Sequence, residues 1–308
     1  MPTTDRPFRF AYQPIGVDER DNIVAAAQQA ERLGYDEYYS SDHFGISDPF
    51  LPLLIAAEAT TTLRFGPLVI NNEFHNPALL ARTAATFDRL SGGRLVLGMG
   101  TGYAVDEHDA IGMPLRARGP RVERLVENLG ALRSLLDAGT AQLDGHDSLT
   151  VESLGVSPAQ ERVPFLVGAN GKRLITLAAE HADILQFTGA EIADDGSLAP
   201  TAFTRADILR RTEWLASAAG NRLKEIEVSA LVQRTAIGDA AAGLRAEISG
   251  LWNLEPDAID GSPFALLGSS VSEVCDKIEG LREDLGISHF VVRDAEGFAP
   301  VVERLAGR

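Results

Sequence analysis

Residues 91–103 read SGGRLVLGMGTGY, and this stretch decides the fold. The glycine pair at 92–93 follows an amphipathic helix, where the backbone needs a positive φ that a Cβ disfavours. Residues 95–97 form a short apolar run, which is typical of parallel strands buried on both faces. Three glycines then keep side chains away from the end of this strand: Gly98, Gly100 and Gly102. Because ligands bind at the carboxyl ends of strands in α/β folds, the stretch predicts a buried strand that leads into a ligand site.

The composition restricts the class of protein. The 308-residue chain carries 44 acidic against 28 basic residues, a formal charge of −16. This acidic balance disfavours binding to nucleic acids and to anionic membranes. Residues 1–9 lack the apolar segment of a signal peptide, and no apolar run approaches the roughly 20 residues that span a bilayer. A single cysteine, Cys275, excludes an internal disulfide, so we expect a cytoplasmic protein.

Strand-like and helix-like segments alternate along the chain. The predicted strands are residues 8–13, 37–41, 64–71, 94–100, 165–168, 183–188, 226–233 and 288–293. The predicted helices are residues 18–33, 51–61, 77–90, 118–137, 172–181, 205–219, 271–285 and 299–305. This alternation favours a closed (β/α)8 barrel over an open doubly wound sheet. We therefore predict an α/β protein, a TIM barrel that forms a single domain over residues 1–308.

Two stretches interrupt the alternation, and we expect insertions at the C-terminal face of the strands. Residues 138–163 are rich in Gly, Asp, Ser and Pro, which indicates an excursion over that face. Residues 237–267 contain one helical segment and then an acidic loop with Pro and Gly. Insertions of this size either shape a substrate pocket or are plain surface loops, and the sequence leaves both open.

A polar motif, Ser-Asp-His at residues 41–43, follows the second predicted strand. His43 is suited to acid or base chemistry near neutral pH. Asp42 beside it would fix a histidine tautomer, or bind a hydroxyl or ring nitrogen of a ligand. The alternative is a helix-capping Asp42 next to a solvent-facing His43, and the motif alone does not decide between the two.

Two further loops follow predicted strands. Asn71 and Asn72 end the third strand, where their amides would bond a polar ligand or simply form a turn before Pro77. Residues 168–173 read GANGKR and lead from the fifth strand into a helix. Backbone N–H groups at a helix start, with two bases close by, form a candidate phosphate cradle. An ordinary strand-to-helix turn with solvated bases is the alternative.

Other chemistries find little support in the sequence. The glycines at 98–102 miss the dinucleotide fingerprint, because the third glycine falls one place early. No arrangement of His, Cys, Asp and Glu has metal-ligand spacing, so we expect no metal. A nucleophile elbow of the G-x-S-x-G type is also missing. Covalent and metal-dependent hydrolysis are therefore disfavoured.

Taken together, these elements resemble the bacterial luciferase-like superfamily of flavin- and deazaflavin-dependent oxidoreductases. The resemblance spans nearly the whole chain, and the combination is more specific than any one motif. The matching motifs are AERLGYD (30–36), SDH (41–43), TLRFG (62–66), HNP (75–77), LSGGR (90–94), PFLVG (164–168) and AAEHAD (178–183). The ending LGISHFVV (285–292) resembles the branch that uses coenzyme F420, a deazaflavin, rather than flavin mononucleotide (FMN).

The resemblance implies where a cofactor would lie at the barrel mouth. Its ring would lie beside Asp42 and His43, over a bulge with a non-prolyl cis peptide bond at Leu68–Val69. Asn71 would contact its tail or its ring edge. The cofactor's side chain would be lined by Thr101, Gly102 and Tyr103, and its phosphate would be held by Gly168, Ala169, Asn170 and Gly171.

Two positions depart from the pattern of the deazaflavin-dependent glucose-6-phosphate dehydrogenases. Those enzymes carry a Trp four residues beyond the His and a Glu directly after the Gly-Thr-Gly turn, where this chain has Ser47 and Tyr103. Without that acid, sugar-phosphate oxidation is disfavoured. Tyr103 would either donate a proton in its place or pack against the cofactor ring.

The resemblance implies an oxidoreductase that transfers a hydride between F420 and an unidentified small organic substrate, with the reduced cofactor as its working form. His43 is the first candidate for proton transfer and Tyr103 the second. An FMN-dependent luciferase-like monooxygenase and a non-catalytic flavin-binding relative are the alternatives. The family resemblance also suggests a homodimer.

Overall fold

The protein, described by a computed structural model, has defined positions for residues 5–16, 19–189, 191–192, 198–200 and 202–308. A nine-stranded sheet of parallel strands forms its centre, in the order β3-β2-β1-β15-β12-β9-β8-β5-β4. Its strands are β1 (Arg9–Tyr12), β2 (Glu37–Ser40), β3 (Arg64–Pro67), β4 (Ile70–Asn71), β5 (Leu97–Gly100), β8 (Phe165–Gly168), β9 (Ile184–Thr188), β12 (Glu227–Leu231) and β15 (Ile287–Val292). A bridge between Phe65 of the terminal strand β3 and Leu95, which lies just before β5, connects the two sides of the sheet, so the barrel is nearly closed.

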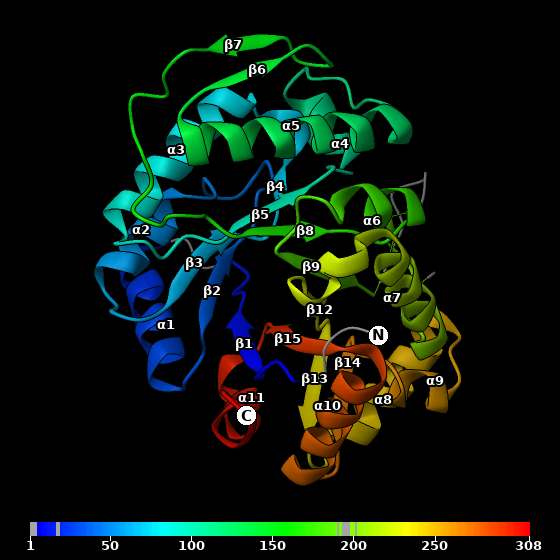
Figure 1. The fold of residues 1–308 in the computed structure, drawn as a ribbon. Helices are drawn as coiled ribbons and strands as arrows, with labels where there is room; N and C mark the ends of the chain where they lie inside the picture. Colours follow the sequence, from blue (N-terminus) through cyan, green and yellow to red (C-terminus); the bar gives the residue numbers. More distant parts are fainter. Residues whose placement is uncertain (1–4, 17–18, 190, 193–197, 201) are drawn as a thin grey trace.

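Helices surround the strands as an outer ring (Figure 1). They are α1 (Arg20–Arg32), α2 (Leu51–Glu58), α3 (Pro77–Leu90), α5 (Arg118–Ala138), α6 (Lys172–Ala178), α7 (Arg205–Ala219), α10 (Val271–Leu285) and α11 (Ala295–Leu305). The predicted (β/α)8 barrel is thus confirmed, because β3 and β4 are two halves of the predicted strand at 64–71. Helix α1 was predicted to begin at residue 18, which lies outside the described residues.

The insertion after β12 contains more regular structure than the sequence indicated. Instead of one helix and a loop, residues 237–267 include two helices and a strand. They are α8 (Ala240–Trp252), α9 (Pro256–Asp260) and β14 (Ala265–Gly268). Strand β13 (Arg234–Ile237) continues the chain from β12 and pairs in parallel with β14. The signal for β14 was missed because its four residues are buried without alternation.

The insertion of residues 138–163 does not cross the carboxyl face of the barrel, contrary to expectation. It contains the hairpin of β6 (Ala141–Leu143) and β7 (Leu149–Val151), which packs on the outer side of α5 (Figure 1). A partly buried ion pair holds it there, since an Arg124 nitrogen lies 2.7 Å from Asp147 Oδ2. The segment links the end of α5 to the start of β8, and therefore begins and ends at the amino side of the strands.

Short elements complete the described part of the chain. They are α4 (Val105–Ala110), the 3-10 turns η1 (Asn72–Phe74) and η2 (Gly220–Lys224), and the strand pair β10 (Glu191–Ile192) and β11 (Leu198–Ala199). Helix α4 matters most for the site, because it lies between β5 and α5 and follows Tyr103 directly.

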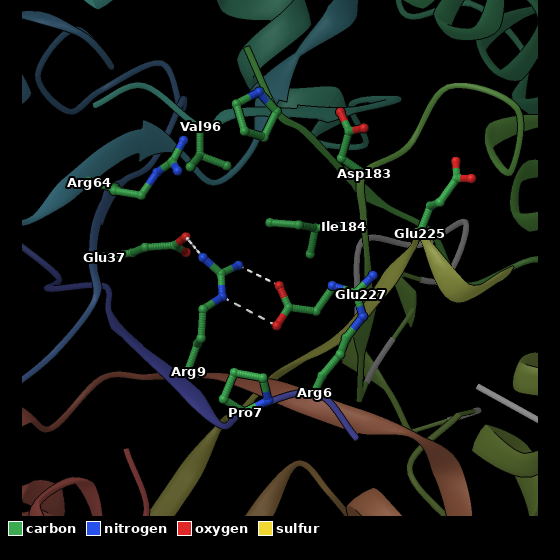
Figure 2. A pocket seen from close by; sticks show the side chains of 11 residues that line it. Arg6, Pro7, Arg9, Glu37, Arg64, Val96, Asp183, Ile184, Glu225 and Glu227 are labelled. Carbon is green, nitrogen blue, oxygen red and sulfur yellow. Dashed lines mark hydrogen bonds and ion pairs between the residues drawn. The ribbon is translucent and has the colours of Figure 1, made fainter. Parts of the chain in front are cut away.

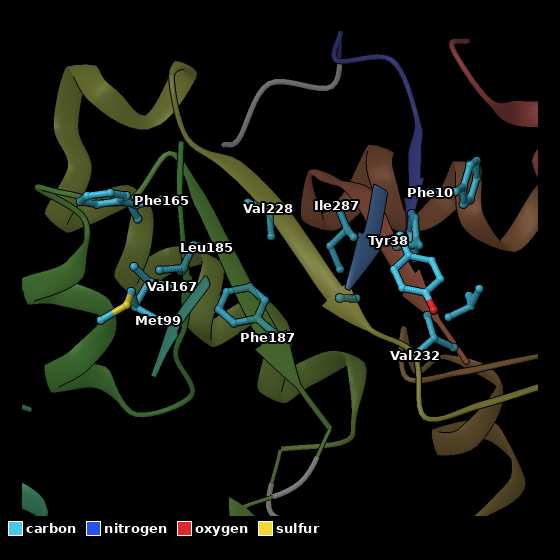
Figure 3. Close-up of a cluster of buried hydrophobic side chains, with 14 of the residues drawn as sticks. Phe10, Tyr38, Met99, Phe165, Val167, Leu185, Phe187, Val228, Val232 and Ile287 are labelled. Carbon is cyan, nitrogen blue, oxygen red and sulfur yellow. The ribbon is translucent and has the colours of Figure 1, made fainter. Parts of the chain in front are cut away.

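The protein has two hydrophobic cores. The larger one lies between strands and helices and includes Phe10, Met99, Phe165 and Phe187 (Figure 3). The smaller one comprises side chains from the alternate strand positions: Ala11, Tyr39, Leu68, Val96, Leu166, Ile184, Leu231 and Val291. Since successive side chains point to opposite faces of a strand, this smaller cluster fills the barrel interior. Partly buried Val69 packs against it.

Candidate functional site

The glycines of the opening stretch allow two neighbouring strands to approach closely. A Cβ on Gly98 would lie 2.1 Å from the Pro67 carbonyl oxygen, and one on Gly100 would lie 2.5 Å from Val69 Cγ2. At Gly102 the φ is +70°, and a Cβ would lie 2.0 Å from Asn71 Oδ1. The space that these glycines leave is therefore filled by residues 67–71, which were expected to support a cofactor ring.

Residues 67–71 form the bulge that the family resemblance implied. The Leu68–Val69 peptide bond is cis, as expected. Buried Gln13 donates a hydrogen bond of 2.8 Å from Nε2 to the Leu68 carbonyl, which fixes the bulge to the end of β1. Val69 then presents a partly exposed apolar side chain at the carboxyl edge, 3.6 Å from the position of a Cβ on Gly168.

His43 lies in the loop after β2 and has polar partners at both ring nitrogens. Its Nδ1 is 2.7 Å from Glu107 Oε1, and its Nε2 is 3.3 Å from the Tyr103 hydroxyl. The same carboxylate accepts a 3.1 Å hydrogen bond from the Phe44 backbone N–H. Two predicted catalytic residues are therefore in contact, and a third residue, Glu107 of α4, joins them. Local sequence patterns carried no signal for Glu107, because 64 residues separate it from His43.

Asp42 does not orient the histidine beside it. Its Oδ2 accepts a 2.9 Å hydrogen bond from the Asn71 backbone N–H and lies 2.9 Å from His75 Nε2. The carboxylate thus connects the loop after β2 to the segment after β4. His75 therefore has a structural role in this connection.

Tyr103 stands at the start of the segment that leads into α4, with 48% of its surface exposed. Its ring meets the His43 ring edge-on, with centroids 5.7 Å apart. Desolvation of the phenol raises the pKa of Tyr103, and the Glu107 charge raises it further, while Arg293 acts in the opposite direction. A raised pKa keeps the hydroxyl protonated at neutral pH, so Tyr103 remains a proton donor there.

Asn71 is 5% exposed, and both ends of its amide are engaged within the protein. Its Oδ1 accepts a 3.1 Å hydrogen bond from the Glu73 backbone N–H, and its Nδ2 lies 3.1 Å from His108 Nε2. These contacts hold α4 against the bulge. Thr101 and Gly102 are half-buried beside it, and Arg121 donates a 3.0 Å hydrogen bond to the Gly102 carbonyl.

The predicted phosphate cradle follows β8 and contains half-buried Gly168 and Gly171, with buried Ala169 between them. The Asn170 side chain turns away to a neighbouring strand, where its Oδ1 accepts a 3.0 Å hydrogen bond from the Thr188 N–H. A Cβ on Gly171 would lie 3.1 Å from the Arg118 guanidinium, so glycine lets this base approach the backbone without a shift of its side chain. The cradle therefore offers backbone groups and a base from α5 rather than the Asn170 amide.

A cavity of about 270 Å³ lies at the opposite end of the barrel (Figure 2). Arg9 occupies its centre, with Nη1 2.7 Å from Glu37 Oε1 and a second ion pair to Glu227. These residues begin β1, β2 and β12, so they form the amino-terminal floor of the barrel. In TIM barrels, residues at the amino-terminal end serve stability, whereas chemistry occurs at the carboxyl face. We therefore assign the candidate site to the mouth.

None of the described helices combines the length and the apolar character needed to cross a membrane. In the same part of the chain, no group of three or more His, Cys, Asp or Glu side chains is arranged to hold a metal ion.

Comparisons with known proteins show which proteins this chain is similar to. A family model described as "Luciferase-like monooxygenase" matches residues 6–289. The chain is 30% identical over 315 residues to an F420-dependent glucose-6-phosphate dehydrogenase from Segniliparus rotundus, with 92% of this chain and 91% of that protein covered. It is 33% identical over 155 residues to a 5,10-methylenetetrahydromethanopterin reductase from Archaeoglobus fulgidus, with 50% of this chain and 45% of the reductase covered. The chain thus matches about half the length of the archaeal reductases.

A solved structure supports the same architecture. The fold is similar to that of the coenzyme F420-dependent tetrahydromethanopterin reductase from Methanopyrus kandleri, with a TM-score of 0.77 and 20% sequence identity. The likeness covers 98% of this chain and 99% of that one. At this identity the comparison establishes the fold alone.

Proposed function

Because the chain belongs to the luciferase-like monooxygenase family, we propose that it is an oxidoreductase that transfers a hydride between coenzyme F420 and a small organic substrate. One observation carries this proposal: a proton-donating pair, His43 and Tyr103, lies at the same carboxyl edge as a glycine-rich cradle with a base, Arg118. A cofactor with a redox ring at one end and a phosphate at the other requires this combination. The F420-dependent relatives support this choice of cofactor.

The residues present fit such a cofactor. Glycine at 171 leaves open a position that a Cβ would fill against Arg118, and the first N–H groups of α6 lack intrahelical acceptors. Apolar Leu68 and Val69 would support the ring. Bound F420 supplies the hydride, while the protein aligns the two partners. Gly168, Ala169 and the backbone of Asn170 would complete the phosphate site, and Thr101 and Gly102 would line the side chain.

For the reaction itself, we propose reduction of a C=C, C=N or C=O bond. The substrate would accept the hydride at carbon and a proton at the second atom of the bond. Tyr103 or His43 would deliver that proton, because their polar atoms lie at the mouth. Glucose 6-phosphate is not the proposed substrate, since Tyr103 stands where the sugar-oxidising relatives carry a carboxylic acid.

Parallel titrations with F420 and FMN test the cofactor assignment. We expect F420 to quench the fluorescence of Trp214 and Trp252 at micromolar concentration, and FMN to bind at least about tenfold more weakly, a difference of about 1.4 kcal/mol. Arg118→Ala should weaken F420 binding about tenfold. Arg82→Ala, which removes an exposed base on α3, is the matched control and should change nothing.

Preferential binding of FMN would overturn the proposal and favour a luciferase-like monooxygenase, which the description of the family model supports. A second assay mixes reduced F420 with an enone, an imine and a ketone, and follows oxidation of the cofactor. Turnover with any of the three supports the reductase. Tight binding without turnover of any of them would instead favour a non-catalytic flavin-binding relative.

We further propose that the protein is a homodimer and works in the cytoplasm. The family resemblance supports the dimer, and the one cysteine, Cys275, is free and buried, which suits a reducing compartment. Light scattering on the purified protein checks the first proposal. A monomer at micromolar concentration would contradict it.

A further inference from the structure

Glu107 stands apart from the other carboxylates near the mouth because it reaches the loop after β2. Its Oε1 lies 2.7 Å from His43 Nδ1, and its Oε2 accepts a 3.1 Å hydrogen bond from the Phe44 N–H. Its side chain is 19% exposed, against 37% for His43. A half-buried carboxylate that uses both oxygens on adjacent residues restrains the orientation of the imidazole.

We infer that Glu107 is the positioning residue of a proton relay that runs from His43 to Tyr103. The inference rests on the proposed function and deepens it. Neighbouring groups do not fill this role: Asp42 is occupied by the Asn71 N–H and by His75, so the carboxylate next to His43 in sequence is not its partner in space. Glu107 therefore does for this histidine what the sequence suggested for Asp42.

The contacts determine the histidine tautomer. An ionised carboxylate only accepts hydrogen bonds, so Nδ1 must carry the proton that points to Glu107. In the neutral imidazole Nε2 is then the acceptor, and it faces the Tyr103 hydroxyl at 3.3 Å.

The relay balances with the proposed reduction. The substrate takes a hydride, with its electron pair, from the reduced cofactor, and its second atom takes the proton of the Tyr103 hydroxyl. Solvent at the exposed mouth then protonates Nε2 of His43, and the tyrosinate takes that proton. His43 returns to its neutral form, with its Nδ1–H still hydrogen-bonded to Glu107.

Nitrogen-15 NMR of the imidazoles tests the tautomer without any cofactor. In the apo protein near neutral pH, the His43 signals, assigned by their loss in His43→Gln, should show protonated Nδ1 and unprotonated Nε2. Glu107→Ala should shift this population toward the Nε2–H form. Asp106→Asn, an exposed carboxylate on the same helix, is the matched control and should leave the signals unchanged. Wild-type protein in the Nε2–H form would overturn the inference.

Kinetics with reduced F420 and the acceptor that gives turnover separate positioning from simple packing. Glu107→Ala should lower kcat roughly 10- to 100-fold, as loss of an orienting partner does elsewhere, and change the F420 dissociation constant less than about twofold. Glu107→Gln keeps an acceptor for Nδ1–H but loses the charge, so it should retain more activity than Glu107→Ala. Equal kcat for wild type and Glu107→Ala would contradict the inference. Failure of F420 to bind would overturn the proposed function, yet leave the NMR result intact.

Discussion

The two ends of the barrel contain the same three residue types in opposite settings. Toward the amino end, Glu37 accepts a hydrogen bond from Tyr39 and lies 3.0 Å from His289 Nε2, and Glu37 and His289 have no exposed side-chain surface. At the mouth, Glu107 likewise contacts a histidine, His43, but here the tyrosine, Tyr103, contacts the histidine rather than the carboxylate, and the side chains are partly exposed. Residue type therefore does not distinguish a structural from a chemical role here. The two roles differ in how deeply the residues are buried and in whether a positive charge neutralises the carboxylate.

The difference appears in the electrostatics. Burial alone would raise the pKa of Glu37, but the charges of Arg9 and His289 outweigh it and hold that pKa well below its ordinary value. Glu37, Tyr39 and His289 form what we call the inner set, and its carboxylate is thus kept ionised and held in place by the Arg9 guanidinium. Glu107, His43 and Tyr103 form the outer set. Among the described residues, no such cation is bonded to the carboxylate of the outer set, and solvent reaches its side chains. Solvent therefore has direct access to the outer set, whereas the side chains of Glu37 and His289 in the inner set are shielded from it.

The largest effect is expected from breaking the inner set. Among the described residues, Glu37→Gln leaves Arg9 with only Glu227 as a charged partner, and removing one member of a buried ion pair typically costs about 3–5 kcal/mol. Urea unfolding measures the loss. Glu225→Gln, at the exposed rim of the same cavity, should cost no more than about 0.5 kcal/mol.

The pH dependence sharpens this prediction. Since the folded pKa of Glu37 is lowered, its contribution is complete above the unfolded value of 4.5 and is lost as the pH falls toward the folded value. The stability difference between wild type and Glu37→Gln should therefore shrink in acid. A difference that stays constant below that pH would show that Glu37 does not act through its charge.

Breaking the outer set should affect catalysis rather than folding. His43→Ala removes the proposed proton donor, so kcat should fall about 100-fold while the F420 dissociation constant changes less than about twofold. Thermal stability should change little, because His43 is partly exposed. His146→Ala, which removes a surface histidine beside Glu127, is the control and should retain full activity. Unchanged turnover at saturating F420 would exclude His43 from the chemistry.

A smaller effect comes from the glycines that bring β5 against the bulge. Gly102 and Gly112 have nearly the same φ, +70° and +68°, but only at Gly102 would a Cβ meet another group, the Asn71 amide. Gly112→Ala should therefore cost about 1 kcal/mol for its backbone alone. Gly102→Ala should cost about 1–3 kcal/mol more because of overpacking. Equal unfolding free energies for the two variants would show that the Asn71 side chain moves aside freely.

Much of the molecule follows from local sequence patterns. The alternation of apolar strands and amphipathic helices predicted the barrel, and three glycines at 98–102 predicted a close approach. The same glycines were taken to clear space for a cofactor, whereas Pro67, Val69 and Asn71 occupy their surroundings. Which segment packs against these glycines depends on how the strands pair in the folded barrel, and the periodicity of apolar residues in the sequence does not encode that pairing.

Partner choice at the mouth was the least predictable part. Asp42 adjoins His43 in sequence, but successive side chains near a strand end point in different directions, so Asp42 bonds Asn71 at the end of β4 and His75 after it instead. Glu107 comes from a six-residue helix with no strong amphipathic pattern, and its partner lies in another βα loop. Contacts between loops depend on the geometry of the closed barrel and not on spacing.

The finest test concerns the phenol of Tyr103, which three groups from different elements face: Glu107 on α4, His43 after β2, and Arg293 after β15. Ultraviolet titration of the apo protein, with Tyr103→Phe subtracted, isolates this residue from the other four tyrosines. Its pKa should lie above the ordinary value of 10.0, chiefly because of desolvation.

Two substitutions should move this titration in opposite directions. Glu107→Gln removes a negative charge and should lower the pKa of Tyr103, whereas Arg293→Met removes a positive charge and should raise it. Asp106→Asn should leave it unchanged. Activity that depends on the Tyr103 proton should then fall at lower pH in Glu107→Gln than in Asp106→Asn. If neither charge moves the titration, solvent screens the outer set fully, and the contrast with the inner set rests on burial alone.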